Sequence, residues 1–229
     1  MNIDDVIAEL APGRSFIDVG GLWGTVNERV SVAKLAGAAR ATMFDLQTPG
    51  NEYWRAFEER CAARGVTGYA SVHGDLNDDA ALEALGRFDL VHCSGVLYHV
   101  PSPMQTLEKL ARLTGRHLLL GACTVPERIE NAAGSLDFSD GRMLFIPALD
   151  GQAKAVLAAH YDMHNIKLLG VNSDAAFGWG APGAWDYAPW WWFWSVGTVA
   201  RMCELAGFRV TRTFEAWPGL AHYLVCETA

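Results

Sequence analysis

The fold of this chain is decided by the stretch Ser15-Phe16-Ile17-Asp18-Val19-Gly20-Gly21-Leu22-Trp23-Gly24-Thr25. Its apolar run from Phe16 to Val19 has the composition of a short buried strand, and the glycines that follow indicate a tight turn. The next segment, about 25 to 37, has the apolar spacing of a helix. A glycine turn lets the backbone approach a ligand, and the N–H groups at a helix start favour a negative or polar group. The stretch therefore predicts a ligand-binding strand, turn and helix.

The glycine spacing departs from the dinucleotide fingerprint G-x-G-x-x-G. Gly20 and Gly24 bracket Gly21, Leu22 and Trp23, so the middle glycine of that pattern is missing. A nucleotide- or NAD-binding protein is therefore a second hypothesis rather than the first.

A second stretch lies further along the chain: Phe88-Asp89-Leu90-Val91-His92-Cys93-Ser94-Gly95-Val96-Leu97-Tyr98-His99-Val100-Pro101-Ser102-Pro103. It resembles the fourth-strand segment of class I S-adenosylmethionine (SAM) dependent methyltransferases. Residues 18–24 resemble the first motif of that family, D/E-x-G-x-G-x-G, with Leu22 where the second glycine is expected. The string ARMCELAGFRV from Ala200 resembles a third family segment, and the resemblance covers about residues 15–123 and 195–229.

The resemblance implies a Rossmann-like, doubly wound α/β fold. Its seven-stranded sheet is mostly parallel with an antiparallel C-terminal strand, and helices cover both faces. The residues that would then lie around the methyl donor are Asp18, Gly20, Gly21, Gly24, Asp45, Leu46, Asp75, Leu76, Cys93 and Ser94.

The roles of five of these residues follow from their places in the predicted strands or from the resemblance. Asp45 ends the predicted second strand, 21 residues after Gly24, where a carboxylate can accept from both ribose hydroxyls; the alternative is a solvated loop aspartate. Leu46 would face the adenine ring. The resemblance implies that Asp75 accepts from the adenine amino group; the alternative is a residue at a helix start. Cys93 and Ser94 end the fourth strand, where open α/β sheets place ligands.

The composition limits the class of protein and of partner. At 229 residues and 51% hydrophobic content, the chain fits one domain with a substantial core. It has no apolar run of about 18 residues and its N-terminus is acidic, so we expect no membrane span and a cytoplasmic location. Its five scattered cysteines indicate reduced thiols. The net charge of -8 argues against a nucleic-acid partner and favours a small-molecule or sugar acceptor.

Residues 124–194 interrupt the regular pattern. A helix is predicted at about 152 to 164, and tryptophans gather from 179 to 194. Because a structureless loop of this length is unusual in a compact domain, we interpret the segment as a substrate-covering insertion in a single domain of residues 1–229. The aromatic run Trp190–Trp194 would line a pocket with some members and hold the insertion to the body with others.

Two histidines are candidate catalytic bases. In-line methyl transfer needs no metal, and a base is required only when the nucleophile is a hydroxyl. His99 lies beside the predicted donor site and titrates near neutral pH, although it can instead have a structural role; Tyr98 is equally placed. His160 and His164 are four residues apart on one helix face, which allows acceptor contact, acid/base work, metal binding or simple exposure. No third metal ligand is obvious.

The sequence thus predicts a SAM-dependent methyltransferase that methylates a hydroxyl of a small molecule, such as a glycan sugar or a natural-product intermediate. An amine acceptor is the second choice. A tRNA-modifying enzyme remains an alternative, because segments such as GVLYH are also found in relatives that modify tRNA. A non-catalytic methyltransferase-like protein is a further one, suggested by Leu22 in place of glycine. The oligomeric state is not predicted.

Overall fold

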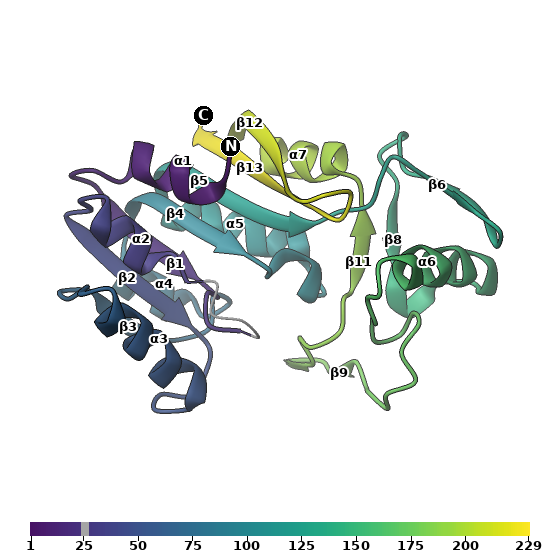
Figure 1. Cartoon of the computed structure of the whole chain (residues 1–229), viewed down its shortest axis with the longest axis horizontal. Helices are drawn as coiled ribbons and strands as arrows, with labels where there is room; N and C mark the ends of the chain where they lie inside the picture. Colours follow the sequence, from purple (N-terminus) through teal and green to yellow (C-terminus); the bar gives the residue numbers. More distant parts are fainter. Residues whose placement is uncertain (24–27) are drawn as a thin grey trace.

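A seven-stranded sheet with strand order β12-β13-β5-β4-β1-β2-β3 forms the centre of the molecule (Figure 1). The computed structural model describes residues 1–23 and 28–229. The parallel strands are β1 (Ser15–Val19), β2 (Arg40–Asp45), β3 (Ala70–His73), β4 (Phe88–Ser94) and β5 (Thr114–Cys123). Strand β13 (Ala221–Thr228) is antiparallel to both β5 and β12 (Phe208–Trp217). The predicted fold is confirmed.

Helices cover both faces of this sheet. The first face carries α1 (Ile3–Leu10), α2 (Val30–Leu35) and α3 (Glu52–Ala63), and the second carries α4 (Asp79–Leu85), α5 (Pro103–Leu113) and α7 (Val196–Leu205). Successive strand residues point to opposite faces, so Phe16 and Leu90 pack under the first set and Ile17 and Val91 under the second. This explains why β1 and β4 are apolar throughout most of their length.

The register of β1 with its neighbours brings the predicted donor-site loops to one edge. Val19 pairs with Phe44 of β2 on one side and with Cys93 of β4 on the other. The chain segments that leave β1, β2 and β4 therefore start side by side at the carboxyl ends of the strands. The short helix η1 (Leu97–His99) follows β4 directly.

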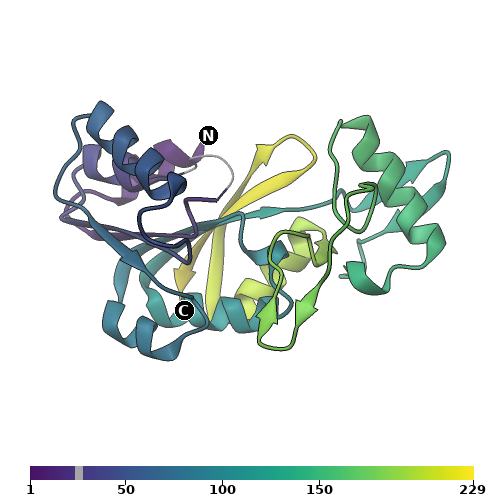
Figure 2. The same ribbon diagram turned by 90° about the horizontal axis from the view of Figure 1, so that it is seen from below.

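The insertion of residues 124–194 has a core of its own, which includes Phe138, Val156 and Tyr161. Its elements are β6 (Arg128–Asn131), β7 (Gly134–Asp137), β8 (Met143–Phe145), η2 (Ile146–Ala148), α6 (Gly151–Met163), β9 (Gly180–Ala181), β10 (Ala184–Trp185) and β11 (Trp192–Trp194). Strands pair as β6–β7, β8–β11 and β9–β10. Figure 2 shows this part projecting to one side of the sheet. The predicted helix of this segment is confirmed as α6.

The tryptophans at the end of the insertion attach it to the sheet and to the segment between η1 and α5. Trp194 is fully buried, and its indole Nε1 donates to the Cys123 carbonyl at 3.0 Å. The indole Nε1 of Trp192 donates to the Pro101 carbonyl at 3.3 Å. Attachment therefore accounts for these two members of the run.

In the described part of the chain, no helix is long and apolar enough to cross a membrane.

Candidate functional site

The turn after β1 is shaped by two glycines. Gly20 has φ +73°, and its N–H donates to the Phe44 carbonyl at 2.9 Å. A Cβ at Gly20 would lie 2.6 Å from Val96 Cγ2, and one at Gly21 would lie 2.7 Å from Asp18 Oδ2. Both positions therefore require glycine, the first for its backbone conformation and its close neighbour, and the second because of a buried carboxylate. Gly24 lies outside the described residues.

Leu22 takes the place of a family glycine without obstructing the site. Its side chain is buried in the core beneath α1, α2 and α3. Its backbone N–H donates to Asp45 Oδ2 at 3.0 Å, so the turn is tied to the end of β2. The position of Leu22 therefore gives no structural reason to expect that donor binding is lost.

A first cavity opens at the carboxyl ends of β1, β2 and β4. Its walls include four of the predicted donor-site residues beyond the glycine turn, namely Asp45, Leu46, Asp75 and Leu76. The complete lining is Val19, Gly20, Trp23, Phe44, Asp45, Leu46, Gln47, Gly74, Asp75, Leu76, Asn77, Gly95, Val96, His99, Val100, Thr106 and Tyr187. Most of the lining residues are apolar, and apolar walls suit the flat ring of a ligand. The carboxylates supply hydrogen-bond acceptors for the polar edges of such a ring.

Asp45 is the most buried carboxylate of the first cavity. Its Oδ2 accepts from Leu22 N–H, and its Oδ1 accepts from Gln47 N–H at 2.9 Å. Burial raises the pKa of Asp45 above the usual value of 3.8, and these backbone hydrogen bonds only partly offset that effect. A buried carboxylate that still faces a cavity can accept further hydrogen bonds from a ligand hydroxyl.

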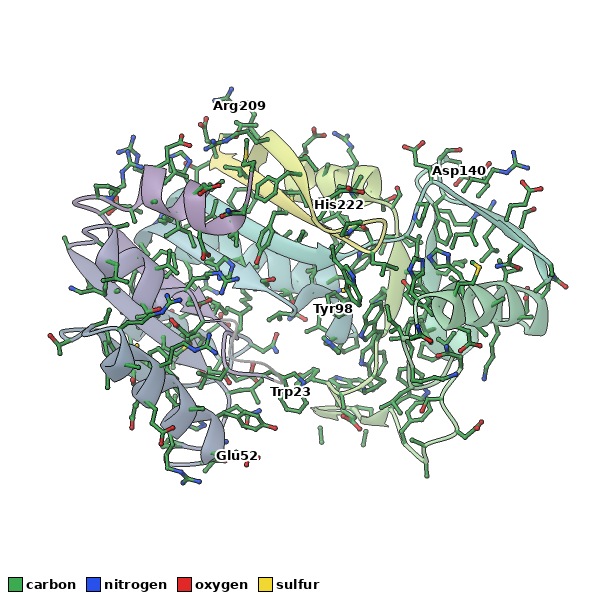
Figure 3. All side chains as sticks on the ribbon, viewed as in Figure 1. Trp23, Glu52, Tyr98, Asp140, Arg209 and His222 are labelled. Atoms are coloured by element: carbon green, nitrogen blue, oxygen red, sulfur yellow. The ribbon has the colours of Figure 1, made fainter. Side chains whose placement is uncertain are left out.

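A second cavity adjoins the first and is more polar. Its lining is Gly20, Trp23, Ser94, Gly95, Tyr98, His99, Gly121, Ala122, Cys123, Ala216, Ala221 and His222. Gly20, Trp23, Gly95 and His99 belong to both cavities. Figure 3 labels Trp23, Tyr98 and His222 in the middle of the molecule, where the sheet faces the insertion. The two cavities therefore share one wall, built by the turns after β1 and β4.

His99 lies in this shared wall as a largely buried imidazole. Its Nδ1 contacts the Pro189 carbonyl at 3.0 Å, and because a carbonyl only accepts, Nδ1 carries the proton. Burial lowers the pKa of His99 below 6.5, although the carbonyls of Pro189 and Tyr187 act in the opposite direction. The neutral ring therefore leaves Nε2 without a proton at pH 7, as a base requires.

Not every predicted site residue lines a cavity. Asp18 is fully buried, where its Oδ2 accepts from Arg29 N–H at 2.6 Å and its Oδ1 contacts His92 Nδ1 at 2.7 Å. Cys93 lies in the core, and burial raises the pKa of its thiol. Gly21 lies against the Asp18 carboxylate and lines neither cavity. Ser94 lines only the second cavity.

The structure does not bring His160 to either cavity. It lies on α6, is 7% exposed, and packs its ring against Tyr161 and His164. Its position follows from how the insertion folds, which helix periodicity alone does not reveal. Among the described residues, no group of three or more histidine, cysteine, aspartate or glutamate side chains is placed to hold a metal ion.

Sequence reasoning missed several residues of the cavity walls. Trp23, Val96, Tyr187 and His222 line one or both cavities. Trp23 and Val96 belong to the quoted motifs, so their places in the turns after β1 and β4 were a usable signal. Tyr187 and His222 come from distant segments, and only the folded chain brings them to the site.

Comparisons with known proteins agree with this geometry. The family model described as a methyltransferase domain matches residues 2–213. A search among curated proteins found no match to the sequence.

Solved structures with this fold include several methyltransferases. Magnesium protoporphyrin IX methyltransferase from Synechocystis PCC 6803, with bound S-adenosylhomocysteine (SAH), is 18% identical with a TM-score of 0.56, over 99% of this chain and 82% of that one. An O-methyltransferase family protein from Burkholderia thailandensis is 16% identical with a TM-score of 0.58, over 99% and 55%. The N-terminal domain of EvdMO1, crystallised in the presence of SAH and D-fucose, is 21% identical with a TM-score of 0.52, over 99% and 81%.

At these identities the likeness concerns the fold, and the family follows from the model that spans nearly the whole chain. The predicted family is thereby confirmed: the chain belongs to the methyltransferase-domain family of enzymes.

Proposed function

We propose that this enzyme transfers the methyl group of SAM to a hydroxyl of a small polar acceptor, such as a sugar or a natural-product intermediate. The observation that carries the proposal is the wall shared by the two cavities, because methyl transfer requires donor and acceptor to meet in line. The first cavity would hold the donor and the second the acceptor.

The first cavity fits SAM by its chemistry. Asp45 would accept hydrogen bonds from the ribose hydroxyls, and Leu46, Asp75 and Leu76 would surround the adenine. Gly20 and Gly95 would let the rest of the donor approach the backbone between β1 and β4. Structural neighbours crystallised with SAM or SAH support this assignment. When bound, SAM supplies a methyl group on a positively charged sulfur.

The second cavity supports a polar acceptor. Ser94, Tyr98, Cys123 and His222 place hydroxyl, thiol and imidazole groups around it, and the indole of Trp23 offers an aromatic face. Such a combination suits a sugar, whose C–H faces pack on aromatic rings while its hydroxyls form hydrogen bonds. The presence of D-fucose with the N-terminal domain of EvdMO1 is in line with this acceptor class.

His99 is the base that we assign to the reaction. As the methyl carbon bonds to the acceptor oxygen and its bond to sulfur breaks, the hydroxyl proton would pass to His99 Nε2. The products are a methyl ether, SAH and an imidazolium, so one positive charge moves from sulfur to the ring. The Pro189 carbonyl holds Nδ1–H at 3.0 Å and thereby orients the ring for this role.

We also propose that residues 1–229 act as one methyltransferase domain whose insertion, residues 124–194, covers the substrates. Tyr187 of the insertion lines the first cavity, and Pro189 holds His99. In addition, Trp191 N–H donates to the Tyr98 carbonyl at 2.7 Å. These contacts attach the end of the insertion to the residues that line the site.

Calorimetric titration with SAM, SAH and NAD tests the proposal. We expect SAM and SAH to bind, NAD not to bind, and Asp45→Ala to weaken SAH binding roughly 10- to 100-fold, because hydrogen bonds to a charged group are lost. Asp140→Ala, at an exposed aspartate of the insertion that lines neither cavity, is the matched control and should bind as wild type (Figure 3). Equal SAH affinity in both variants would contradict the proposed contact between Asp45 and the ribose. Binding of NAD alone would overturn the proposed function.

The acceptor class needs a second assay. SAH formation should be detected with members of a panel of free hexoses, D-fucose among them, and not with a tRNA transcript. Turnover of the transcript alone would replace the small-molecule acceptor by RNA.

A further inference from the structure

A chain of buried polar side chains leads from the centre of the sheet to the second cavity. Asp18 of β1 contacts His92 Nδ1 of β4 at 2.7 Å, and His92 Nε2 lies 3.3 Å from the Tyr223 hydroxyl of β13. The Tyr223 hydroxyl donates to Ser94 Oγ at 3.1 Å. Asp18, His92 and Tyr223 are at most 7% exposed, whereas Ser94 lines the second cavity. Three strands thus contribute to one path.

The space for this path depends on Gly121 of β5. A Cβ at Gly121 would lie 2.3 Å from Ser94 Oγ and 2.8 Å from Tyr223 Cε1. Any larger residue would push the two hydroxyls apart. The absence of a side chain at this position therefore allows the hydrogen bond between Tyr223 and Ser94.

The direction of the hydrogen bonds is fixed at the Asp18 end and depends on the proton count of His92 at the other. The Asp18 carboxylate only accepts, so His92 Nδ1 carries a proton. In the arrangement in which Tyr223 gives its single hydroxyl hydrogen to Ser94, the hydrogen between His92 and Tyr223 comes from His92 Nε2. His92 is then doubly protonated, and its charge is balanced by Asp18. The hydroxyl hydrogen of Ser94 is not used in any hydrogen bond of this path.

We propose that Asp18, His92 and Tyr223 form a hydrogen-bonded chain that holds Ser94 as a hydrogen-bond donor toward the acceptor. His92 and Tyr223 are then positioning residues, and Ser94 is a specificity-determining residue that selects an acceptor with an oxygen lone pair beside the attacked hydroxyl. The inference rests on the proposed function, because it takes the second cavity as the acceptor site.

Charged groups near His92 lie on several elements. Asp18 faces its ring from β1, and Tyr223 faces it from β13. Arg29 and Asp4 lie further out near Tyr223, where Arg29 Nε pairs with Asp4 at 3.0 Å. The charge of Arg29 is thus matched locally by Asp4, and Asp18 is the carboxylate in contact with the His92 ring.

The reverse arrangement uses the same heavy atoms with one proton fewer. If His92 Nε2 carried no proton, Tyr223 would donate to His92 and Ser94 would donate to Tyr223. Ser94 would then present only lone pairs to the cavity. The proton on His92 Nε2 therefore decides whether the second cavity offers a donor or an acceptor at this point.

Nitrogen NMR of protein labelled with ¹⁵N-histidine tests the chain without any acceptor. With SAH bound at neutral pH, we expect both ring nitrogens of His92 to carry protons in wild type, and Nε2 to lose its proton in Tyr223→Phe. The His92 signal is assigned by its loss in His92→Gln or, if that variant does not fold, by elimination through single glutamine substitutions of the other six histidines. An unprotonated Nε2 in wild type would overturn the proposal.

Tyr161→Phe is the matched control for loss of a buried tyrosine hydroxyl. Tyr161 is also fully buried, and its hydroxyl has no partner among the described residues. This variant should leave the His92 signals unchanged. A response of His92 equal to that of Tyr223→Phe would mean that the signals report general packing, which would overturn the assignment.

Kinetics with an active sugar from the hexose panel provide the functional test. Tyr223→Phe, Gly121→Ala and Ser94→Ala should each raise KM for the sugar roughly two- to tenfold, the cost of one hydrogen bond, with little change in kcat. The double variant Ser94→Ala/Tyr223→Phe should be no worse than Ser94→Ala alone, because Tyr223 acts through Ser94. Additive effects would overturn the chain. If no sugar is methylated, the proposed acceptor class is wrong. The nitrogen spectrum alone then tests the hydrogen-bonded path from Asp18 to Ser94.

Discussion

Asp45 gives donor binding a pH dependence that can be derived from its environment. Because burial raises its pKa above 3.8, the carboxylate takes up a proton at a higher pH than an exposed aspartate does. The protonated form accepts ribose hydroxyls less well, so SAH affinity should fall on acidification through this raised pKa. Calorimetry from pH 7 downward measures the fall. Asp45→Asn should bind more weakly at pH 7 without that pH dependence, and an unchanged pH dependence in Asp45→Asn would assign the effect to another group.

The environment of His99 predicts a pH dependence of turnover that differs from the pH dependence of donor binding. Its pKa is lowered below 6.5 by burial, so the neutral base persists to lower pH than a solvent-exposed imidazole would. Methyl transfer should therefore decline only below pH 6.5, as the ring becomes protonated. His99→Gln should reduce kcat about 100- to 10,000-fold and remove this decline. SAH formation with an active sugar gives both profiles, and His164→Gln is the control. A loss below tenfold in His99→Gln would show that the base lies elsewhere.

At the scale of elements, β11 connects the insertion to the sheet through one fully buried indole. Trp194 packs in the core with α5 and α7 and donates to the Cys123 carbonyl at the end of β5. Trp194→Ala should lower the free energy of unfolding by about 3 to 5 kcal/mol. Trp217→Ala, at a tryptophan 46% exposed, should change it by less than about 0.5 kcal/mol. Urea denaturation distinguishes the two, and similar losses would mean that Trp194 does not connect the parts as described.

The elements were also where the sequence was most informative. Strands β1 and β4 lie close to their predicted bounds, because an apolar run between a turn and a helix identifies a buried parallel strand from local residues alone. Asp45 was placed at the end of β2 by the same reasoning, and it does line the first cavity. The contact between His92 and Tyr223 joins residues 131 positions apart. No local pattern reports a pairing that arises only when β13 inserts beside β5.

At the scale of the whole molecule, the insertion was the part that the sequence predicted least. Its helix was expected, yet the position of His160 on that helix said nothing about where the helix would pack. The core of the insertion, around Phe138 and Tyr161, is separate from the two cores of the sheet. His160 belongs near that core, whereas Tyr187 extends from the same insertion to the first cavity. The proposed covering role would therefore concern the segment around Tyr187 rather than α6.

Hydrogen exchange can test this division within the insertion. Donor binding should slow amide exchange in residues 187–191, because Tyr187 lines the first cavity and Trp191 N–H is bonded to the Tyr98 carbonyl. Residues 74–77, which form another wall of that cavity, should be slowed as well, while α6 should exchange at the same rate with and without SAH. Mass spectrometry of peptides from protein with excess SAH measures all three regions together. The Asp45→Ala variant at the same SAH concentration supplies the control with little ligand bound. Equal protection of α6 and residues 187–191 would show that the insertion responds as one body, and no protection of residues 187–191 would remove the covering role.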